Sequence, residues 1–233
     1  MEEIKHNSSS SDRSLFLDAL RGFTVILMII FHFSFDLDYF GLVKIDIVNA
    51  PFWYFFPRLI VFLFLFAVGI ALSLAHKNNI RWKSFIHRLL LIIFWAIIIS
   101  ITTYYFFPDS WIYFGTLHSI AVVSVMSLPF LKRPWESLAI ALCLFIPSIF
   151  WDYNLPWIQL SHTSWDYISP FPWVGASLLG IFATHKKIHM LNIPNNKLTK
   201  SLNYLGKHSL FIYLIHQPIL FGLLMLTIKI IRS

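Results

Sequence analysis

The sequence predicts an all-α fold, a polytopic transmembrane helix bundle of about seven spans. Of the 233 residues, 58% are hydrophobic, 18% are aromatic and only 12% are charged, and the mean hydropathy is +0.70. A water-soluble domain carries charge on about a quarter of its residues. The charged side chains are therefore too few to cover the surface of a soluble protein, and backbone that lies in lipid must form helices to satisfy its own hydrogen bonds.

Apolar stretches define the individual spans. A helix rises 1.5 Å per residue, so about 20 residues cross the roughly 30 Å of hydrocarbon in a bilayer. The stretches that reach or approach this length are 15–38, 52–75, 86–107, 111–131, 135–151, 167–184 and 209–230. Prolines shorten or interrupt the fourth to sixth of them, namely Pro129, Pro147, Pro170 and Pro172.

The distribution of charge predicts the orientation. Residues 1–14 are polar and rich in serine, and we expect a disordered cytoplasmic tail before a single transmembrane domain over 15–233. Most lysines and arginines lie in this tail and in the second, fourth and sixth connections between spans. Because cytoplasmic loops carry the excess of basic residues, the N-terminus is predicted inside and the C-terminus outside. These basic loops either contact anionic lipid or attract an anionic cosubstrate, and charge alone does not separate the two.

Several classes of protein are excluded or disfavoured. The single cysteine, Cys143, precludes an intramolecular disulfide and a cysteine metal cage, and we expect no metal. The chain has no phosphate-binding P-loop, no zinc-protease motif and no hydrolase elbow. Its basic residues are dispersed over loops, which argues against nucleic acid as a partner.

The first span carries a stripe of ionisable residues. At about 100° per residue, the side chains of Asp18, Arg21, His32 and Asp36 fall on one face of the helix. Ionisable groups are costly in hydrocarbon, so this stripe should border the bundle interior or a polar passage. Asp18 and Arg21, three residues apart, either form a local ion pair or help to bind a cosubstrate.

His32 and Asp36 are one helical turn apart, so the carboxylate is expected to accept a hydrogen bond from the imidazole. A carboxylate that orients an imidazole in this way is typical of a general base or a nucleophile. The alternative is a histidine that merely forms a hydrogen bond between helices.

Three further spans bring polar side chains to similar depths. We expect Arg58 and His118 to meet His32 and Asp36 in one pocket in the outer half of the membrane, with His216 deeper. For each of these residues a structural role is the alternative. The segment SPFPWVG, residues 169–175, predicts a bent start of the sixth span that would wall this pocket.

Four segments carry a family resemblance. LDALRGFTVILMIIFHFSFDL at 17–37, FGTLHSI at 114–120, SPFPWVG at 169–175 and LGKHSLFIYLIHQP at 205–218 resemble bacterial membrane proteins related to the catalytic domain of heparan-alpha-glucosaminide N-acetyltransferase. The resemblance implies a transmembrane acyltransferase that takes acetyl groups from cytosolic acetyl-CoA and delivers them to an acceptor across the membrane. It also suggests a bacterial inner membrane as the location.

A wider similarity exists to bacterial O-acyltransferases of envelope polysaccharides, which carry an arginine and, eleven positions on, an essential histidine. Arg21 and His32 have that spacing here. The lysosomal enzyme has its histidine in a loop after the first helix, and this chain has none between Phe33 and Ala75. Which histidine performs the chemistry is thus left open.

The favoured hypothesis is acyl transfer from acetyl-CoA, as a cosubstrate, to a sugar, amino-sugar or polysaccharide acceptor on the outer side. The pantetheine arm would pass beside Asp18, Arg21 and His216, His32 would accept the acyl group or a proton, and Arg58 or His118 would stabilise the oxyanion. The alternatives are a transporter or carrier without bond chemistry and an accessory subunit. The sequence is compatible with a homo-oligomer and does not identify the acceptor.

Overall fold

The computed structural model describes residues 15–46, 50–194 and 196–231, and in these ranges all regular structure is helical. The predicted tail over 1–14 lies outside them. The helices are α1 (Leu15–Tyr39), α2 (Pro51–Ala75), α3 (Trp82–Phe106), α4 (Thr116–Ser127), α5 (Pro134–Trp151), α6 (Val174–His185), α7 (Lys197–Lys207) and α8 (Ser209–Ile231), with 3-10 turns at Leu128–Phe130 and Ile188–Met190. The all-α prediction is confirmed.

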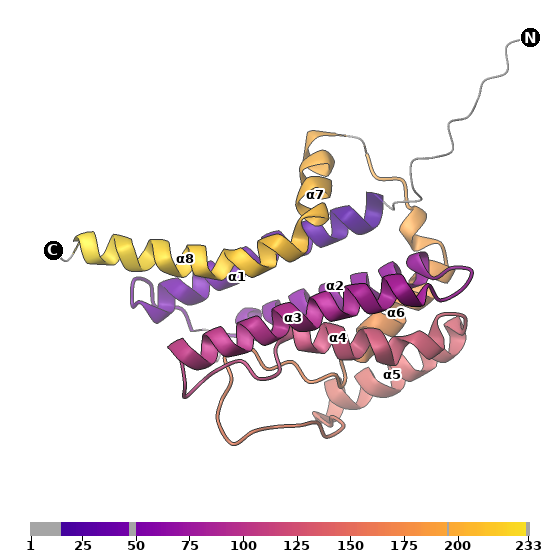
Figure 1. Ribbon diagram of the computed structural model, residues 1–233, viewed down its shortest axis with the longest axis horizontal. Coiled ribbons are helices and arrows are strands. Elements are labelled where there is room, and N and C mark those ends of the chain that lie inside the picture. The colour runs from indigo at the N-terminus through magenta and orange to yellow at the C-terminus, as the bar shows by residue number, and fades with distance from the viewer. Residues whose placement is uncertain (1–14, 47–49, 195, 232–233) are drawn as a thin grey trace, which may run out of the picture.

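Five of these helices, α1, α2, α3, α5 and α8, are long and apolar enough to cross a membrane. They run along the length of the molecule, and α8 lies beside α1 at one edge of the bundle (Figure 1). The chain is thus an integral membrane protein. The fourth and sixth predicted spans are shorter helices: α4 begins at Thr116 instead of 111, and α6 begins at Val174 instead of 167.

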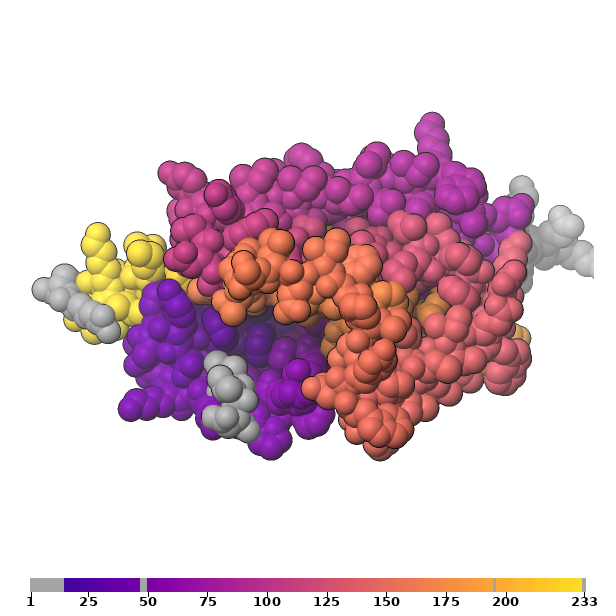
Figure 2. Space-filling view, turned by 90° about the horizontal axis from the view of Figure 1, so that it is seen from below, coloured from indigo at the N-terminus to yellow at the C-terminus, as the bar shows by residue number. Residues whose placement is uncertain are grey.

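Two loops replace the missing helical turns at the predicted outer end. The α3–α4 loop and the α5–α6 loop lie against each other through backbone hydrogen bonds from Trp165 N to Ser110 O (3.2 Å) and from Ile168 N to Phe114 O (2.9 Å). The longer of the two is the orange band that crosses the face of the molecule in Figure 2. Non-helical backbone is tolerated at membrane depth where protein satisfies it, which explains why apolar, aromatic loops resemble spans in the sequence.

The central helix, α2, crosses α6 at very short range. A Cβ atom added to Gly69 of α2 would collide with the backbone of Ser177, and one added to Gly180 of α6 would collide with the carbonyl oxygen of Phe66. The Ser177 hydroxyl also accepts a hydrogen bond of 2.9 Å from Ser127 Oγ. Small residues and a buried hydroxyl pair are the usual means by which membrane helices approach closely.

Helix α7 crosses the start of α1 in the same manner, and it stands across the direction of the long helices in Figure 1. A Cβ atom added to Gly206 would collide with the carbonyl oxygen of Asp18, and one added to Gly22 with that of Leu202. The sequence predicts this segment only as a connection between the sixth and seventh spans. The helix escapes notice because it is short and polar, although Asn196 caps its start by accepting a hydrogen bond from Thr199 N (2.9 Å).

Helix α8 is peripheral. His216 is the only buried residue among those of α8 that the structure describes. Its first half packs through Tyr213 against α1 and α2 on one side and α3 and α4 on the other. Its second half exposes apolar side chains such as Leu223, Leu226 and Ile230. A helix that buries its one histidine and exposes its leucines is suited to a lipid-facing position.

Candidate active site

The polar stripe of α1 faces the protein as predicted. Asp18 and Asp36 are almost fully buried. Asp18 Oδ1 lies 3.9 Å from a guanidinium nitrogen of Arg21, so the two residues form the local ion pair that was one of the two roles considered for them. The carbonyl of Asp18 is the atom on which Gly206 of α7 packs. The start of the stripe is therefore covered by α7, and the rest of it meets α8.

His32 and His216 form a direct pair between α1 and α8. Their ring centroids are 4.8 Å apart with an interplanar angle of 63°. The Nδ1 atom of His216 lies 2.7 Å from the carbonyl oxygen of Tyr213. A carbonyl only accepts hydrogen bonds, so this nitrogen carries the proton and, in the neutral ring, Nε2 keeps a free lone pair. This is the tautomer that a general base requires.

Asp36 has a different partner from the one predicted. Its Oδ1 accepts a hydrogen bond of 2.8 Å from Nε2 of Gln217. Among the described residues, no hydrogen bond joins Asp36 to His32, so that prediction is wrong. The reason is the approach of α8, which brings an amide donor to the carboxylate and a second imidazole to His32.

Three buried acceptor atoms of this cluster lack donors within the described part of the chain. They are Oδ2 of Asp36, Nε2 of His216 and Oε1 of Gln217. Buried polar atoms in native proteins nearly always have a partner, so such a concentration calls for a ligand or for ordered water. Since all three are acceptors, the complementary ligand is one rich in O–H or N–H groups.

An aromatic cluster closes the site at the predicted outer end. Trp165 of the α5–α6 loop contacts Phe35 and Tyr39 of α1 and Phe107 at the end of α3, at ring-centroid distances of 5.9, 5.4 and 4.8 Å. Phe221 of α8 lies 5.8 Å from Tyr39. The indole of Trp165 is 40% exposed. The loop thus ties the end of α1 to the end of α3 close to Asp36, and Phe221 adds the middle of α8 to the same aromatic cluster.

His118 lies in a separate network at the start of α4. Its Nδ1 accepts a hydrogen bond of 3.1 Å from Gly115 N, and its Nε2 lies 3.2 Å from Ser100 Oγ of α3. The Ser100 hydroxyl donates to Ile112 O at 2.6 Å, so it accepts from the ring. Both ring nitrogens are therefore engaged in holding α4 to α3 and to the loop before it.

Asp166 holds the same helix terminus from the α5–α6 loop. Its Oδ2 accepts a hydrogen bond of 2.8 Å from Thr116 N, and the Thr116 hydroxyl also lies within hydrogen-bonding distance. Burial raises the pKa of Asp166, and the hydrogen bonds from Thr116 oppose that rise. A carboxylate at the N-terminus of α4 is favoured by the helix dipole.

Arg58 points away from the cluster. Its guanidinium lies 3.5 Å from the centroid of the Tyr54 ring and donates to the Tyr54 carbonyl at 2.6 Å on the exposed side of α2. The structure thus brings His32, Asp36 and His216 together and leaves His118 and Arg58 in other surroundings. Gln217 was missed as a site residue. An amide beside a proline in an otherwise apolar span was the available signal.

Comparison with known proteins gives one family match. The family model described as heparan-alpha-glucosaminide N-acetyltransferase, catalytic, matches residues 13–218, nearly the whole chain. No curated protein and no solved structure matches this chain. The matched range includes every helix but the end of α8, and both halves of the His32–His216 cluster. The chain belongs to the family of the heparan-alpha-glucosaminide N-acetyltransferase catalytic domain.

Proposed function

We propose that this protein is a membrane acyltransferase that moves an acetyl group from acetyl-CoA to a sugar or amino-sugar acceptor at the outer side. Family membership supports the acyltransferase class. The observation that carries the proposal is the acceptor-only cluster: His216 Nε2, Asp36 Oδ2 and Gln217 Oε1 are buried without donors in the described chain. A sugar supplies such donors from its hydroxyl and amino groups.

The cluster provides a base for the transfer. In the direct route, the acceptor's amine or hydroxyl attacks the thioester carbonyl carbon, its proton passes to Nε2 of His216, and the carbon–sulfur bond breaks. The CoA thiolate then leaves and receives that proton, so the products are the acetylated acceptor and free CoA. Asp36 and Gln217 would orient the acceptor, and the neighbouring ring of His32 would share the proton.

The covalent route uses His32 as the nucleophile. Its imidazole attacks the thioester carbon, the carbon–sulfur bond breaks, and the CoA thiolate takes the N–H proton of the ring and leaves as the thiol. The acceptor then attacks the resulting acetyl-imidazole while His216 removes the acceptor's proton, which passes to the released ring of His32. The two routes differ in kinetics, since the covalent one is ping-pong and the direct one needs a ternary complex. In both, the base at His216 and the ring of His32 are required.

The protein's orientation in the proposal follows the positive loops, with the N-terminus in the cytoplasm. The test uses the purified protein in proteoliposomes with acetyl-labelled acetyl-CoA on one side and glucosamine, as an amino-sugar probe, on the other. We expect labelled N-acetylglucosamine to appear with the wild type and to fall by about 10²–10⁴-fold with His32→Ala. His208→Ala, an exposed histidine before α8, is the matched control. Full transfer by His32→Ala, or none by the wild type with any hexosamine, contradicts the proposal.

A further inference from the structure

Two open grooves lie at the predicted cytoplasmic end of the bundle, where the α2–α3 and α4–α5 connections meet. The larger has a volume of about 540 Å³ and includes Trp82, Lys132 and Arg133 in its lining. The smaller has a volume of about 290 Å³ and includes Arg81, His87 and Arg88. His76 lines both grooves, and neither is lined by an aspartate or a glutamate.

The pKa of His76 reflects the positive electrostatic potential of this region. Its pKa is lowered first by burial and then by the charges of Arg81 and Arg88. Arg81 N donates a hydrogen bond of 3.1 Å to Nδ1 of His76, so Nε2 of the neutral ring is a donor. Repulsion between neighbouring positive charges of this kind is relieved by a bound anion.

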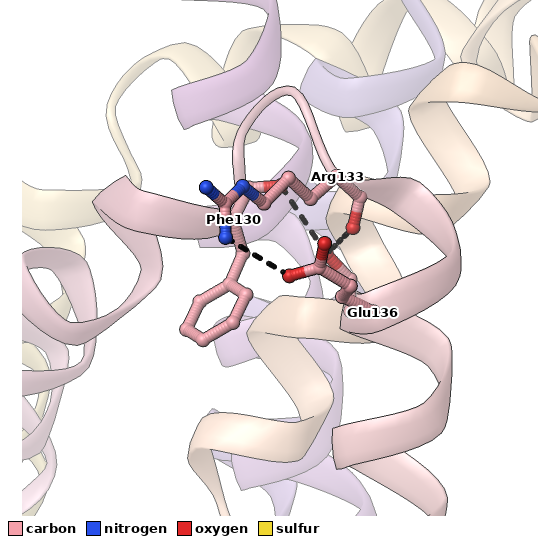
Figure 3. A network of polar contacts seen from close by, with 4 residues as sticks. Phe130, Arg133 and Glu136 are labelled. Atoms are coloured by element: carbon pink, nitrogen blue, oxygen red, sulfur yellow. Dashed lines mark hydrogen bonds and ion pairs between the residues drawn. The ribbon is translucent and has the colours of Figure 1, made fainter.

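A network of polar contacts surrounds Arg133 of the larger groove, as Figure 3 shows. Arg133 pairs with Glu136 at 3.2 Å. The hydroxyl of Ser137 lies 2.8 Å from the carbonyl of Arg133 and 3.3 Å from that of Phe130, which fixes the turn between α4 and α5. Because Arg133 is neutralised by Glu136, the net positive charge of this rim comes from Lys132, which is exposed.

The lining of the smaller groove changes from basic to apolar side chains with depth. Below Arg88 it is lined by apolar side chains, among them Val68 of α2 and Ile92 of α3, one turn further along α3. Ile92 also packs in the same cluster as Tyr213 of α8. The carbonyl of Tyr213 holds His216 in its tautomer. The apolar end of the groove thus adjoins the side-chain cluster that contains Tyr213, whose carbonyl contacts His216.

We propose that the two grooves form a binding site for a phosphate-bearing ligand, whose phosphates lie among His76, Arg81, Arg88 and Lys132 and whose slender arm enters the apolar depth between α2 and α3. The adenosine bisphosphate end and pantetheine arm of CoA have this chemistry, and to that extent the inference rests on the proposed function. An anionic phospholipid has it as well, with its headgroup phosphate and one acyl chain. Neither groove is lined by Arg21, beside which we expected the arm from the sequence.

The test measures binding rather than turnover, so it stays separate from the test of acetyl transfer. The full chain is placed in phosphatidylcholine nanodiscs and titrated by calorimetry with free CoA and with adenosine 3′,5′-bisphosphate. Removing one charge-assisted contact should weaken binding about ten-fold or more, both in Arg88→Gln and in the surface variant Lys132→Gln. Lys200→Gln on α7 removes the same charge elsewhere and should change nothing.

The lipid source is examined by repeating the experiment with phosphatidylglycerol in the nanodiscs. If a lipid occupies the site, the anionic lipid will raise the melting temperature of the wild type but not of Lys132→Gln, and it will compete with CoA. If CoA binds but no acetyl group is transferred, the phosphate-binding site is supported and the proposed function is contradicted. The inference is overturned if neither ligand responds to Arg88→Gln and Lys132→Gln, or if Lys200→Gln weakens binding equally.

Discussion

The side chain of Gln217 donates a hydrogen bond of 2.8 Å to the buried carboxylate of Asp36, and this contact joins α8 to α1 at the level of the histidine pair. His216 is the one buried residue among the described residues of α8, and Gln217 is half-buried. The position of His216 relative to His32 thus depends on this polar contact and on the packing around Tyr213.

We predict that this contact contributes measurably to stability. Gln217→Ala leaves a buried carboxylate without its donor, which should cost about 1–3 kcal/mol of unfolding free energy. In a double-mutant cycle with Asp36→Ala, measured by denaturant unfolding in detergent, the two changes should be coupled by an amount of the same order. Strict additivity of the two single variants would show that the contact contributes nothing.

His118 should affect stability rather than chemistry. Both of its ring nitrogens have partners that hold α4, so we expect His118→Ala to lower the free energy of unfolding by about 1–2 kcal/mol, in the range of lost helix caps. The rate of acetyl transfer per folded molecule should stay near that of the wild type. A variant that keeps its melting temperature but loses the rate would restore the catalytic role that the sequence suggested for His118.

The crossing of α7 over α1 should tolerate no side chain. Gly206→Ala places a methyl group against the carbonyl of Asp18, and overpacking of this kind costs about 1–3 kcal/mol. Gly222→Ala in α8 is the control, because an added Cβ there has nothing within 4 Å. Thermal unfolding in detergent should show a lower melting temperature for the first variant only. Equal melting temperatures for both would mean that α7 is not seated on α1.

Binding of an anion in the cytoplasmic grooves should strengthen as the pH falls. The pKa of His76 is held below its ordinary value of 6.5 in the free protein, by burial and by Arg81 and Arg88, and a bound anion raises it again. Proton uptake therefore accompanies binding, and affinity rises as the pH decreases from about 6.5 toward the lowered pKa of the free protein.

The titratable groups that line the smaller groove with His76 are Arg81, His87 and Arg88, and those that line the larger groove with it are Lys132 and Arg133. Sulfate, which does not titrate in this range, is the probe, and His76→Gln is the comparison. The pH dependence should be steeper in the wild type than in His76→Gln. An equal pH dependence of sulfate binding in the wild type and in His76→Gln would show that His76 does not take up the proton.

The sequence predicted the fold better than the contacts within it. Long apolar stretches predicted the bounds of four of the five long helices to within one residue, because lipid makes both length and polarity decisive. The fifth, α3, begins at Trp82 instead of 86. The outer parts of two other stretches proved to be loops, since an aromatic loop such as the one around Trp165 is as apolar as a helix. Helix α7 was missed because its stability depends on Gly22 and Gly206, which only the packed structure brings together.

The site was predicted in part. Helical geometry was enough to place Asp18, Arg21, His32 and Asp36 on one face. It gave no information on which residue of another helix each would meet, and so the pairing of Asp36 with Gln217 and of His32 with His216 required the structure. The depth of Arg58 along its predicted span likewise suggested that it lies in the pocket. Its side chain instead turns outward and packs on the ring of Tyr54.

The central claim is that the His32–His216 pair performs acyl transfer, and the most direct test is the rate of CoA release from acetyl-CoA in His216→Gln. With glucosamine as the probe acceptor, the account predicts a loss of about 10²–10⁴-fold, while binding of free CoA, measured on the same sample, is unchanged. If the covalent route operates, intact-mass measurement of the same variant without acceptor should also show an adduct of about 42 Da on His32. An unchanged rate of CoA release in a folded His216→Gln variant would contradict the account.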